Sequence, residues 1–271
     1  MMIFKLKPGD EMPVLGLGTW QAEGDECYES VKKALELGYR HIDTAEMYDN
    51  EEEIGRAVAD SDVDREDIFI TSKLWFSHYK PEDAVKACEE SLKKLQTDYL
   101  DLYLLHWPEQ GTSLKNTIEA LNKLVEEGKV RNIGVSNFSN KRFEKAQSYS
   151  DVPLACNQVE CHPYLQQNKI LEFCKEKGVA MTAYSPLARG EVFDNEVLKE
   201  VAEKHDVSVA QVALRWQIQR GAIVIPKATT EEHIKDNFAV LDLELDADDM
   251  EKINNLNKNK RLIDPGFAKW D

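Results

Sequence analysis

Four polar residues follow apolar, strand-like runs in the first half of the chain: Asp43, Tyr48, Lys73 and His106. Asp43 ends the run YRHID, Lys73 ends IFITSK, and His106 ends LDLYLLH. Tyr48 lies in the loop that follows Asp43. An acid, a phenol, an ammonium and an imidazole are together the groups that a proton-donating site requires.

The chemistry that these groups suggest is reduction of a carbonyl. A tyrosine titrates near ~10, so it is a reluctant acid at neutral pH. A lysine beside it would stabilise the phenolate and lower the pKa of Tyr48, and Asp43 could hold that lysine in place. His106 could hydrogen-bond the oxygen of a substrate carbonyl. Proton donation to that oxygen must be matched by hydride at carbon, which a nicotinamide can supply.

Each of the four residues also has a purely structural interpretation. Asp43 could form an ordinary ion pair or cap a helix, Tyr48 could be a rim aromatic, and His106 could be a core histidine. Lys73 is harder to explain in this way, because an ammonium on an apolar strand needs a carboxylate partner. Asp43 on the preceding strand is the expected partner.

Strand-like and helix-like stretches alternate along most of the chain, which predicts a parallel α/β architecture. Helices are expected over 27–37, 84–95 and 114–126, and a further helix is expected after Ser208. The expected strands cover 14–19, 39–43, 68–73, 100–106, 130–136, 155–160, 179–185 and 222–226.

Eight strands alternating with helices predict a (β/α)8 TIM barrel, formed by residues 1–271 as a single domain. We expect an N-terminal β-hairpin, with its turn at Pro8-Gly9-Asp10, to close the bottom of the barrel. Such barrels carry their chemistry at the carboxyl ends of the strands. The four residues described above fall at those ends.

The composition limits the partners and the compartment. The net charge of −16 disfavours nucleic acid and anionic membranes. We find no apolar run of membrane-spanning length and no signal peptide. Five cysteines without a CxxC pair indicate reduced thiols in a cytoplasmic protein. Cys161 and His162 are adjacent without further ligands nearby, so we expect no metal.

Eight motifs are spread along essentially the whole chain: LGLGTW (15–20), GYRHIDTAEMYDNE (38–51), ITSKLW (70–75), DLYLLHWP (101–108), RNIGVSNF (131–138), NQVECHPY (157–164), AYSPLARG (183–190) and VIPKATTEEHIKDN (224–237). Together they resemble the motifs of the aldo-keto reductase family. The short loop after His106 and the tail RLIDPGFAKWD are similar to the small bacterial branch of 2,5-diketogluconate and methylglyoxal reductases.

The resemblance implies a role for each group. It makes Tyr48 the general acid, Lys73 and Asp43 the residues that tune it, and His106 the residue that positions the carbonyl. Read without the family, three of the implied cofactor residues (Ser136, Asn137 and Gln158) could instead be turn formers. The implied cofactor-binding residues are Gly18, Thr19, Trp20, Asp43, Ser136, Asn137, Gln158, Tyr184, Ser185, Leu187, Arg189, Pro226, Lys227, Ala228, Thr229, His233, Asp236 and Asn237.

The phosphate end departs from the family pattern. Lys227 matches the lysine that meets the 2′-phosphate of NADPH, but Ala228 stands where serine is common. His233 stands where arginine is frequent, and a neutral imidazole carries little of the charge of a guanidinium. Asp236 replaces a usual glutamate. We therefore expect NADPH as the cofactor, with NADH also accepted.

The resemblance places Trp20, Trp75, His106 and Trp107 around the substrate. Phe267 and Trp270 in the tail could add a lid. The short tail and the short loop after His106 predict an open pocket for small, polar carbonyl compounds. We expect a monomer that acts on methylglyoxal or keto-sugar acids. The alternative from another class is a redox-sensing regulatory subunit that binds the cofactor without significant turnover.

Overall fold

Eight parallel strands form the centre of the molecule in a computed structural model that describes residues 2–7, 9–108 and 111–268. Neighbouring strands follow the order of the sequence, so each crossover joins adjacent strands. The strands are β3 (Leu17–Gly18), β4 (His41–Asp43), β5 (Phe69–Leu74), β6 (Leu100–Leu105), β7 (Val130–Ser136), β8 (Cys156–Glu160), β9 (Ala180–Tyr184) and β10 (Ile223–Val224).

The sheet closes on itself between β10 and β3. Parallel bridges join Leu15 to Val224 and Gly18 to Lys227, and the Gly18 N–H donates to the Pro226 carbonyl at 3.1 Å. A Cβ at Gly18 would lie 2.5 Å from the Ile225 carbonyl oxygen, so only glycine allows this approach. The predicted (β/α)8 barrel is therefore confirmed, although β3 and β10 are shorter than expected.

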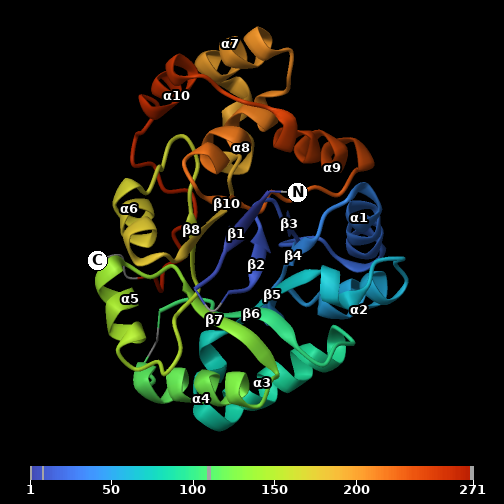
Figure 1. Ribbon diagram of the computed structural model, residues 1–271, viewed down its shortest axis with the longest axis vertical. Helices are drawn as coiled ribbons and strands as arrows, with labels where there is room; N and C mark the ends of the chain where they lie inside the picture. The colour runs from blue at the N-terminus through green and yellow to red at the C-terminus, as the bar shows by residue number, and fades with distance from the viewer. Residues whose placement is uncertain (1, 8, 109–110, 269–271) are drawn as a thin grey trace.

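The N-terminal hairpin pairs β1 (Ile3–Lys5) with β2 (Glu11–Pro13) in antiparallel fashion. Leu6 and Met12 are buried against residues of the barrel interior such as Leu102. Figure 1 shows β1 and β2, in blue, across the middle of the ring of strands. The hairpin therefore closes the end of the barrel opposite the expected site, as predicted. Pro8 of the expected turn lies outside the described residues.

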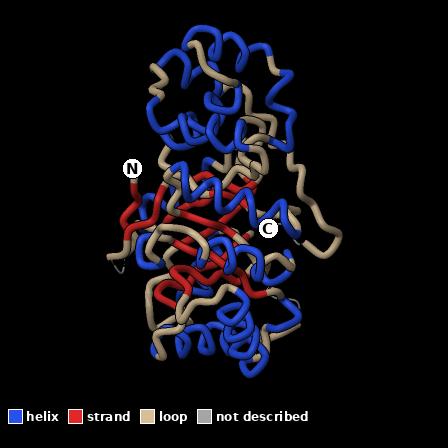
Figure 2. The backbone as a smooth tube through the Cα atoms, turned by 90° about the vertical axis from the view of Figure 1, so that its right-hand side faces the viewer, coloured by secondary structure: helices blue, strands red, loops and turns tan. Residues whose placement is uncertain are grey.

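Helices surround the strands, and Figure 2 shows the strands between groups of helices. They are α1 (Gly24–Leu37), α2 (Glu51–Ala59), α3 (Pro81–Lys94), α4 (Leu114–Glu126), α5 (Asn140–Gln147), α6 (Asn168–Lys177), α7 (Glu196–His205), α8 (Val209–Gln219), α9 (Glu231–Phe238) and α10 (Ala247–Asn254). Within the described part of the chain, none is long and apolar enough to cross a bilayer.

Short-range signals in the sequence set the helix ends. Pro81 starts α3 because its missing N–H costs nothing in the first turn, as the start signal Lys80-Pro81-Glu82-Asp83 indicates. Gly38 ends α1 with a φ of 105°, a conformation that favours glycine. The Ser208 hydroxyl caps α8 by accepting from the Gln211 N–H.

All five cysteines are buried thiols: Cys27, Cys88, Cys156, Cys161 and Cys174. Burial raises the pKa of each to about 12, because a thiolate would lose its hydration in these positions. They act as small apolar residues of the core.

Candidate active site

A cleft of about 870 Å³ opens at the carboxyl ends of the barrel strands. Asp43, Tyr48 and His106 line it, while Lys73 lies behind them with no exposed surface. The sheet brings these residues together because β4, β5 and β6 are neighbours, and all four residues lie on these strands or in the loops that follow them. The predicted group therefore assembles at the predicted end of the barrel.

Lys73 connects the group. Its Nζ donates to Asp43 Oδ1 at 2.5 Å, to the Thr44 carbonyl at 2.8 Å and to the Tyr48 hydroxyl at 3.3 Å. Burial lowers the pKa of Lys73, but Asp43 and then Tyr48 raise it more, so the net pKa lies above the ordinary value. The lysine is therefore a cation at neutral pH. The expected pairing with Asp43 is present.

Tyr48 ends the short 3-10 helix η1 (Glu46–Tyr48) that follows β4. Burial raises the pKa of its hydroxyl, Lys73 lowers it and Asp43 raises it. The net direction is upward, whereas the sequence predicted that Lys73 would bring this pKa down. Lys73 acts in the expected sense, but loss of hydration at the phenol outweighs it. Tyr48 is thus held in its protonated form.

His106 follows β6 and faces the same space. Burial, and then the charge of Lys73, lower the pKa of its imidazole well below the usual value, so the ring is neutral at pH 7. Its centroid lies 5.6 Å from that of Tyr48 and 5.1 Å from that of Trp75. A neutral imidazole has one N–H, which can donate to a carbonyl oxygen beside Tyr48.

A chain of hydrogen bonds continues from Asp43 across β8, β7 and β9. Gln158 Nε2 donates to Asp43 Oδ2 at 2.6 Å, so both carboxylate oxygens are engaged. The Ser136 hydroxyl donates to the Gln158 carbonyl at 2.9 Å. The Tyr184 hydroxyl donates to Asn137 Oδ1 at 2.8 Å. These side chains form a fixed polar wall beside the acid group.

Asn137 has a φ of 64°, a left-handed conformation that asparagine tolerates better than most residues. Its Nδ2 donates to the His106 carbonyl at 3.1 Å and to Ser136 Oγ at 3.1 Å. The residue therefore shapes the turn after β7 and also presents its amide to the cleft. The interpretation of Asn137 as a turn former and its interpretation as a cofactor-binding residue therefore do not exclude each other.

At the end of the cleft formed by Lys227, His233 and Asp236, fewer side chains that line the cleft are held by hydrogen bonds. Lys227 Nζ donates to the Gln21 carbonyl at 2.8 Å, and His233 is an exposed residue that also lines the cleft. Asp236 lines the cleft, but its carboxylate accepts from the Ser208 hydroxyl at 2.6 Å and from Gln211 Nε2 at 2.7 Å.

The remaining predicted residues of this end divide into two groups. Pro226 and Asn237 line the cleft with those above. Ala228 and Thr229 lie outside its lining, because the chain turns away after Lys227 and buries Ala228 in the core.

The loop after β9 crosses the mouth of the cleft. Ser185, Ala188 and Arg189 have φ values of 48°, 49° and 52°, which bend the chain sharply. The Arg189 guanidinium lies 5.2 Å from the centroid of the Trp20 ring. The predicted residues Ser185, Leu187 and Arg189 line the cleft together with Gly18, Thr19, Trp20 and the polar wall.

The substrate end is mainly apolar. Phe267 packs edge-on against Trp75 and Trp107, with centroids 6.0 and 5.3 Å apart. Met47 and Trp20 complete this side. We expected a pocket for polar compounds on the basis of loop length alone, and the side chains that form it are less polar than that expectation implied. Trp270 lies outside the described residues.

Sequence reasoning missed part of the lining. Proximity to a motif could have indicated Met47 and Gln21, but no local pattern marks residues that reach the cleft from a distant loop, helix or tail. The residues missed are Gln21, Met47, Pro186, Gly190, Phe193, Ser208, Ala210, Ile225, Glu232, Ile263 and Pro265.

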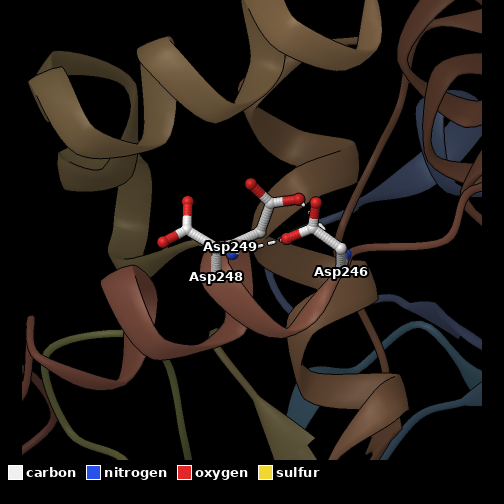
Figure 3. Close-up of side chains that lie close together, drawn as sticks. All are labelled: Asp246, Asp248 and Asp249. Carbon is white, nitrogen blue, oxygen red and sulfur yellow. Dashed lines mark hydrogen bonds between the residues drawn. The ribbon is translucent and has the colours of Figure 1, made fainter.

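A second cluster of acids lies at the start of α10 (Figure 3), where Asp246, Asp248 and Asp249 come together. Asp246 caps the helix by accepting from the Asp249 N–H, and Asp249 accepts from the Asp246 N–H. Lys204 contacts both at 2.6 and 2.8 Å. Asp246 and Asp249 thus form a helix capping box paired with Lys204, and Asp248 pairs with Lys252 at 3.1 Å, so these contacts explain the cluster.

The structure is a closed (β/α)8 barrel that holds a tyrosine hydroxyl against a buried Lys–Asp pair at the carboxyl ends of its strands. The chain belongs to the aldo/keto reductase family, whose model matches residues 14–258. This family acts on small carbonyl substrates and generally uses NAD(P)H. The resemblance inferred from the motifs is confirmed.

The relatives agree with this assignment. Glyoxal reductase of Bacillus subtilis is 48 % identical over 259 residues, which cover 95 % of this chain and 94 % of that protein. An aldo/keto reductase structure from Brucella melitensis is 46 % identical with a TM-score of 0.90, covering 94 % of this chain and 99 % of that one. A structure whose proposed identity is 2,5-diketo-D-gluconic acid reductase B is 40 % identical, with a TM-score of 0.95 and coverage of 100 % and 98 %.

Proposed function

We propose that this protein reduces the aldehyde or ketone group of small carbonyl compounds, such as methylglyoxal or keto-sugar acids, with NADPH. The observation that carries the proposal is the position of Lys73 Nζ, which joins Asp43 at 2.5 Å to the Tyr48 hydroxyl at 3.3 Å in the floor of the cleft. The relative named glyoxal reductase supports a dicarbonyl substrate.

The residues of the cleft fit a nicotinamide dinucleotide. One end offers the ring of Tyr184 and the polar groups of Asn137 and Gln158, which suit a flat aromatic amide. The other end offers the ammonium of Lys227, which suits a phosphate. A volume of about 870 Å³ accommodates an extended ligand of this size. When bound, the cofactor supplies the hydride for the carbonyl carbon.

The protein's own residues handle the proton. His106 donates its N–H to the carbonyl oxygen and orients it, and Tyr48 transfers its hydroxyl proton to the same oxygen. Lys73 stabilises the phenolate that remains, and Asp43 keeps the ammonium beside it. Because the group is largely dry, this charge–charge attraction is much stronger than it would be in water. Tyr48 then regains a proton from solvent.

Selectivity for NADPH should be incomplete. Among the predicted residues from Pro226 to Asn237, Lys227 carries the ammonium that suits a phosphate, and His233 stands where an arginine would supply a second strong partner. Glu232 lines the same end of the cleft and would repel a phosphate. We therefore propose that NADH is also used. We further propose a monomeric, cytoplasmic protein, with residues 1–271 as one domain, that binds neither nucleic acid nor membranes.

The test is a screen with both reduced cofactors. Methylglyoxal with NADPH should consume the reduced nicotinamide absorbance, and NADH should support a slower reaction. The control is the same assay with Tyr48→Phe. If the protein binds NADPH but reduces none of a panel of aldehydes and ketones, it is a cofactor-binding regulator instead.

A further inference from the structure

Glu160, the residue that ends β8, binds the C-terminal tail and is not part of the proton-donating group. Glu160 is completely buried, with no exposed side-chain surface. Its Oε1 accepts the backbone N–H of Leu262 at 2.7 Å, and its Oε2 accepts that of Ile263 at 3.0 Å. A single carboxylate in the barrel wall therefore holds two successive peptide groups of the C-terminal tail.

Charged and polar neighbours complete the surroundings of this carboxylate. His162 Nε2 lies 2.9 Å from Oε1, and Arg261 Nη1 lies 3.7 Å from Oε2. A buried carboxylate is costly unless its oxygens are satisfied, and charge-assisted bonds to N–H groups are among the stronger ones. The arrangement therefore fixes the tail at a defined point rather than leaving it loosely packed.

The segment that follows this point forms one wall of the substrate end. Ile263, Pro265 and Phe267 all line the cleft. The ring of Phe267 lies 5.3 Å from that of Trp107 and 5.1 Å from that of Phe76. Because the chain leaves Glu160 at Ile263 and reaches the cleft directly, the position of this wall depends on where Glu160 holds the tail.

Glu160 is separate from the proposed chemistry. Among the described residues, its carboxylate makes no hydrogen bond to Asp43, Tyr48, Lys73 or His106. Loss of the anchor should therefore alter how a substrate's substituent is held, while the proton donor stays intact.

We propose that Glu160 is a positioning residue that sets substrate specificity by holding the apolar tail wall against the carbonyl pocket. Substrates with an aromatic substituent gain most from this wall, because they bury more apolar surface on Phe267 than a methyl group does. This inference rests on the proposed carbonyl reduction and extends it to the substrate class that the pocket favours.

The kinetic test compares phenylglyoxal with methylglyoxal, which differ only in the substituent. Glu160→Gln should raise KM for phenylglyoxal about tenfold and KM for methylglyoxal less than about threefold, with kcat nearly unchanged. The matched control is Glu51→Gln, which alters another buried carboxylate that bonds the Ser72 hydroxyl away from the tail. Equal changes for the two substrates would overturn the proposal.

A double-mutant cycle with Phe267→Ala tests the route of the effect. If Glu160 acts through the tail, Glu160→Gln should have almost no further effect on KM for phenylglyoxal once Phe267 is gone. Additive effects in the cycle would show that Glu160 acts elsewhere, for instance on the barrel itself.

Hydrogen exchange of the tail provides a readout without turnover. Glu160→Gln should speed exchange at Leu262 and Ile263 while the barrel strands keep their protection. Leu262→Pro, which deletes one N–H from the tail side, provides a second variant if changes at Glu160 prevent folding. Unchanged exchange at Leu262 and Ile263 would refute the proposal that Glu160 holds the tail in place. Faster exchange in a protein that reduces no carbonyl would instead refute the proposed function.

Discussion

The two ends of the cleft differ in how firmly their polar groups are held. At the acid end, Asp43, Lys73 and Gln158 are at most 2 % exposed, and each has hydrogen-bond partners at fixed positions. At the far end, Lys227 and His233 are exposed and make few side-chain bonds. The proposed chemistry would therefore depend on a preorganised buried network, whereas the proposed cofactor choice would depend on a few solvated side chains whose interactions water and salt weaken.

The largest expected effect is loss of the acid itself. Tyr48→Phe should lower kcat about 1000-fold, because the other donor to the carbonyl oxygen, the neutral imidazole of His106, is a much weaker acid than a phenol. Binding of NADPH, followed by fluorescence titration, should be nearly unchanged. A small loss of kcat would mean that the proton comes from elsewhere.

Lys73→Met should lower kcat about 100-fold by removing the cation that stabilises the phenolate. It should also destabilise the fold by about 3 kcal/mol, because Asp43 is left buried with its charge unpaired. Urea unfolding measures the second effect. Asp43→Asn in the same background should recover part of the lost stability.

Lys227→Met tests the far end of the cleft. It should raise KM for NADPH about tenfold and leave KM for NADH almost unchanged, because the exposed ammonium would meet only the 2′-phosphate. The penalty should shrink as ionic strength rises. A similar rise in KM for both cofactors would mean that Lys227 contacts a group that NADPH and NADH share.

His233→Arg should act in the opposite direction and more weakly. An arginine can fork onto phosphate and remains charged, so KM for NADPH should fall about threefold while KM for NADH changes little. Steady-state kinetics with both cofactors measures this effect. Equal tightening of both would refute the phosphate assignment of this position.

The smallest expected effect concerns the pH dependence of kcat, to which His106 should contribute no titration in the ordinary histidine range. The pKa of this imidazole is lowered, so the ring stays uncharged as the pH falls through the ordinary histidine range near ~6.5. The value of kcat should therefore show no decline around that pH, and protonation should begin only well below it. A clear acid limb near pH 6.5 that disappears in His106→Gln would contradict this assignment.

The sequence predicted the barrel and the acid group because both depend on local patterns. Alternating apolar runs specify the strands, and residues directly after a strand must lie at one end of a parallel barrel. The buried position of Lys73 beside Asp43 followed from two neighbouring strands. The net pKa of Tyr48 could not be predicted, since it depends on the balance between burial and the charge of Lys73.

Long-range placements also escaped prediction. Ser208 and Gln211 engage Asp236 from a different helix, and the Glu160 carboxylate accepts backbone N–H groups of the distant C-terminal tail. No spacing rule links residues so far apart in the chain. The departures from the family motif at Ala228 and His233 were visible in the sequence, but whether they matter depends on which side chains face the cleft.

The burial of every cysteine bears on survival in the presence of the proposed substrates. Dicarbonyl compounds are electrophiles to which thiolates add, and the pKa of each of the five thiols is raised to about 12. At neutral pH almost none of the five cysteine thiols is ionised, and all five are buried. A carbonyl reductase built in this way would resist modification of its thiols by the dicarbonyl compounds that we propose as substrates.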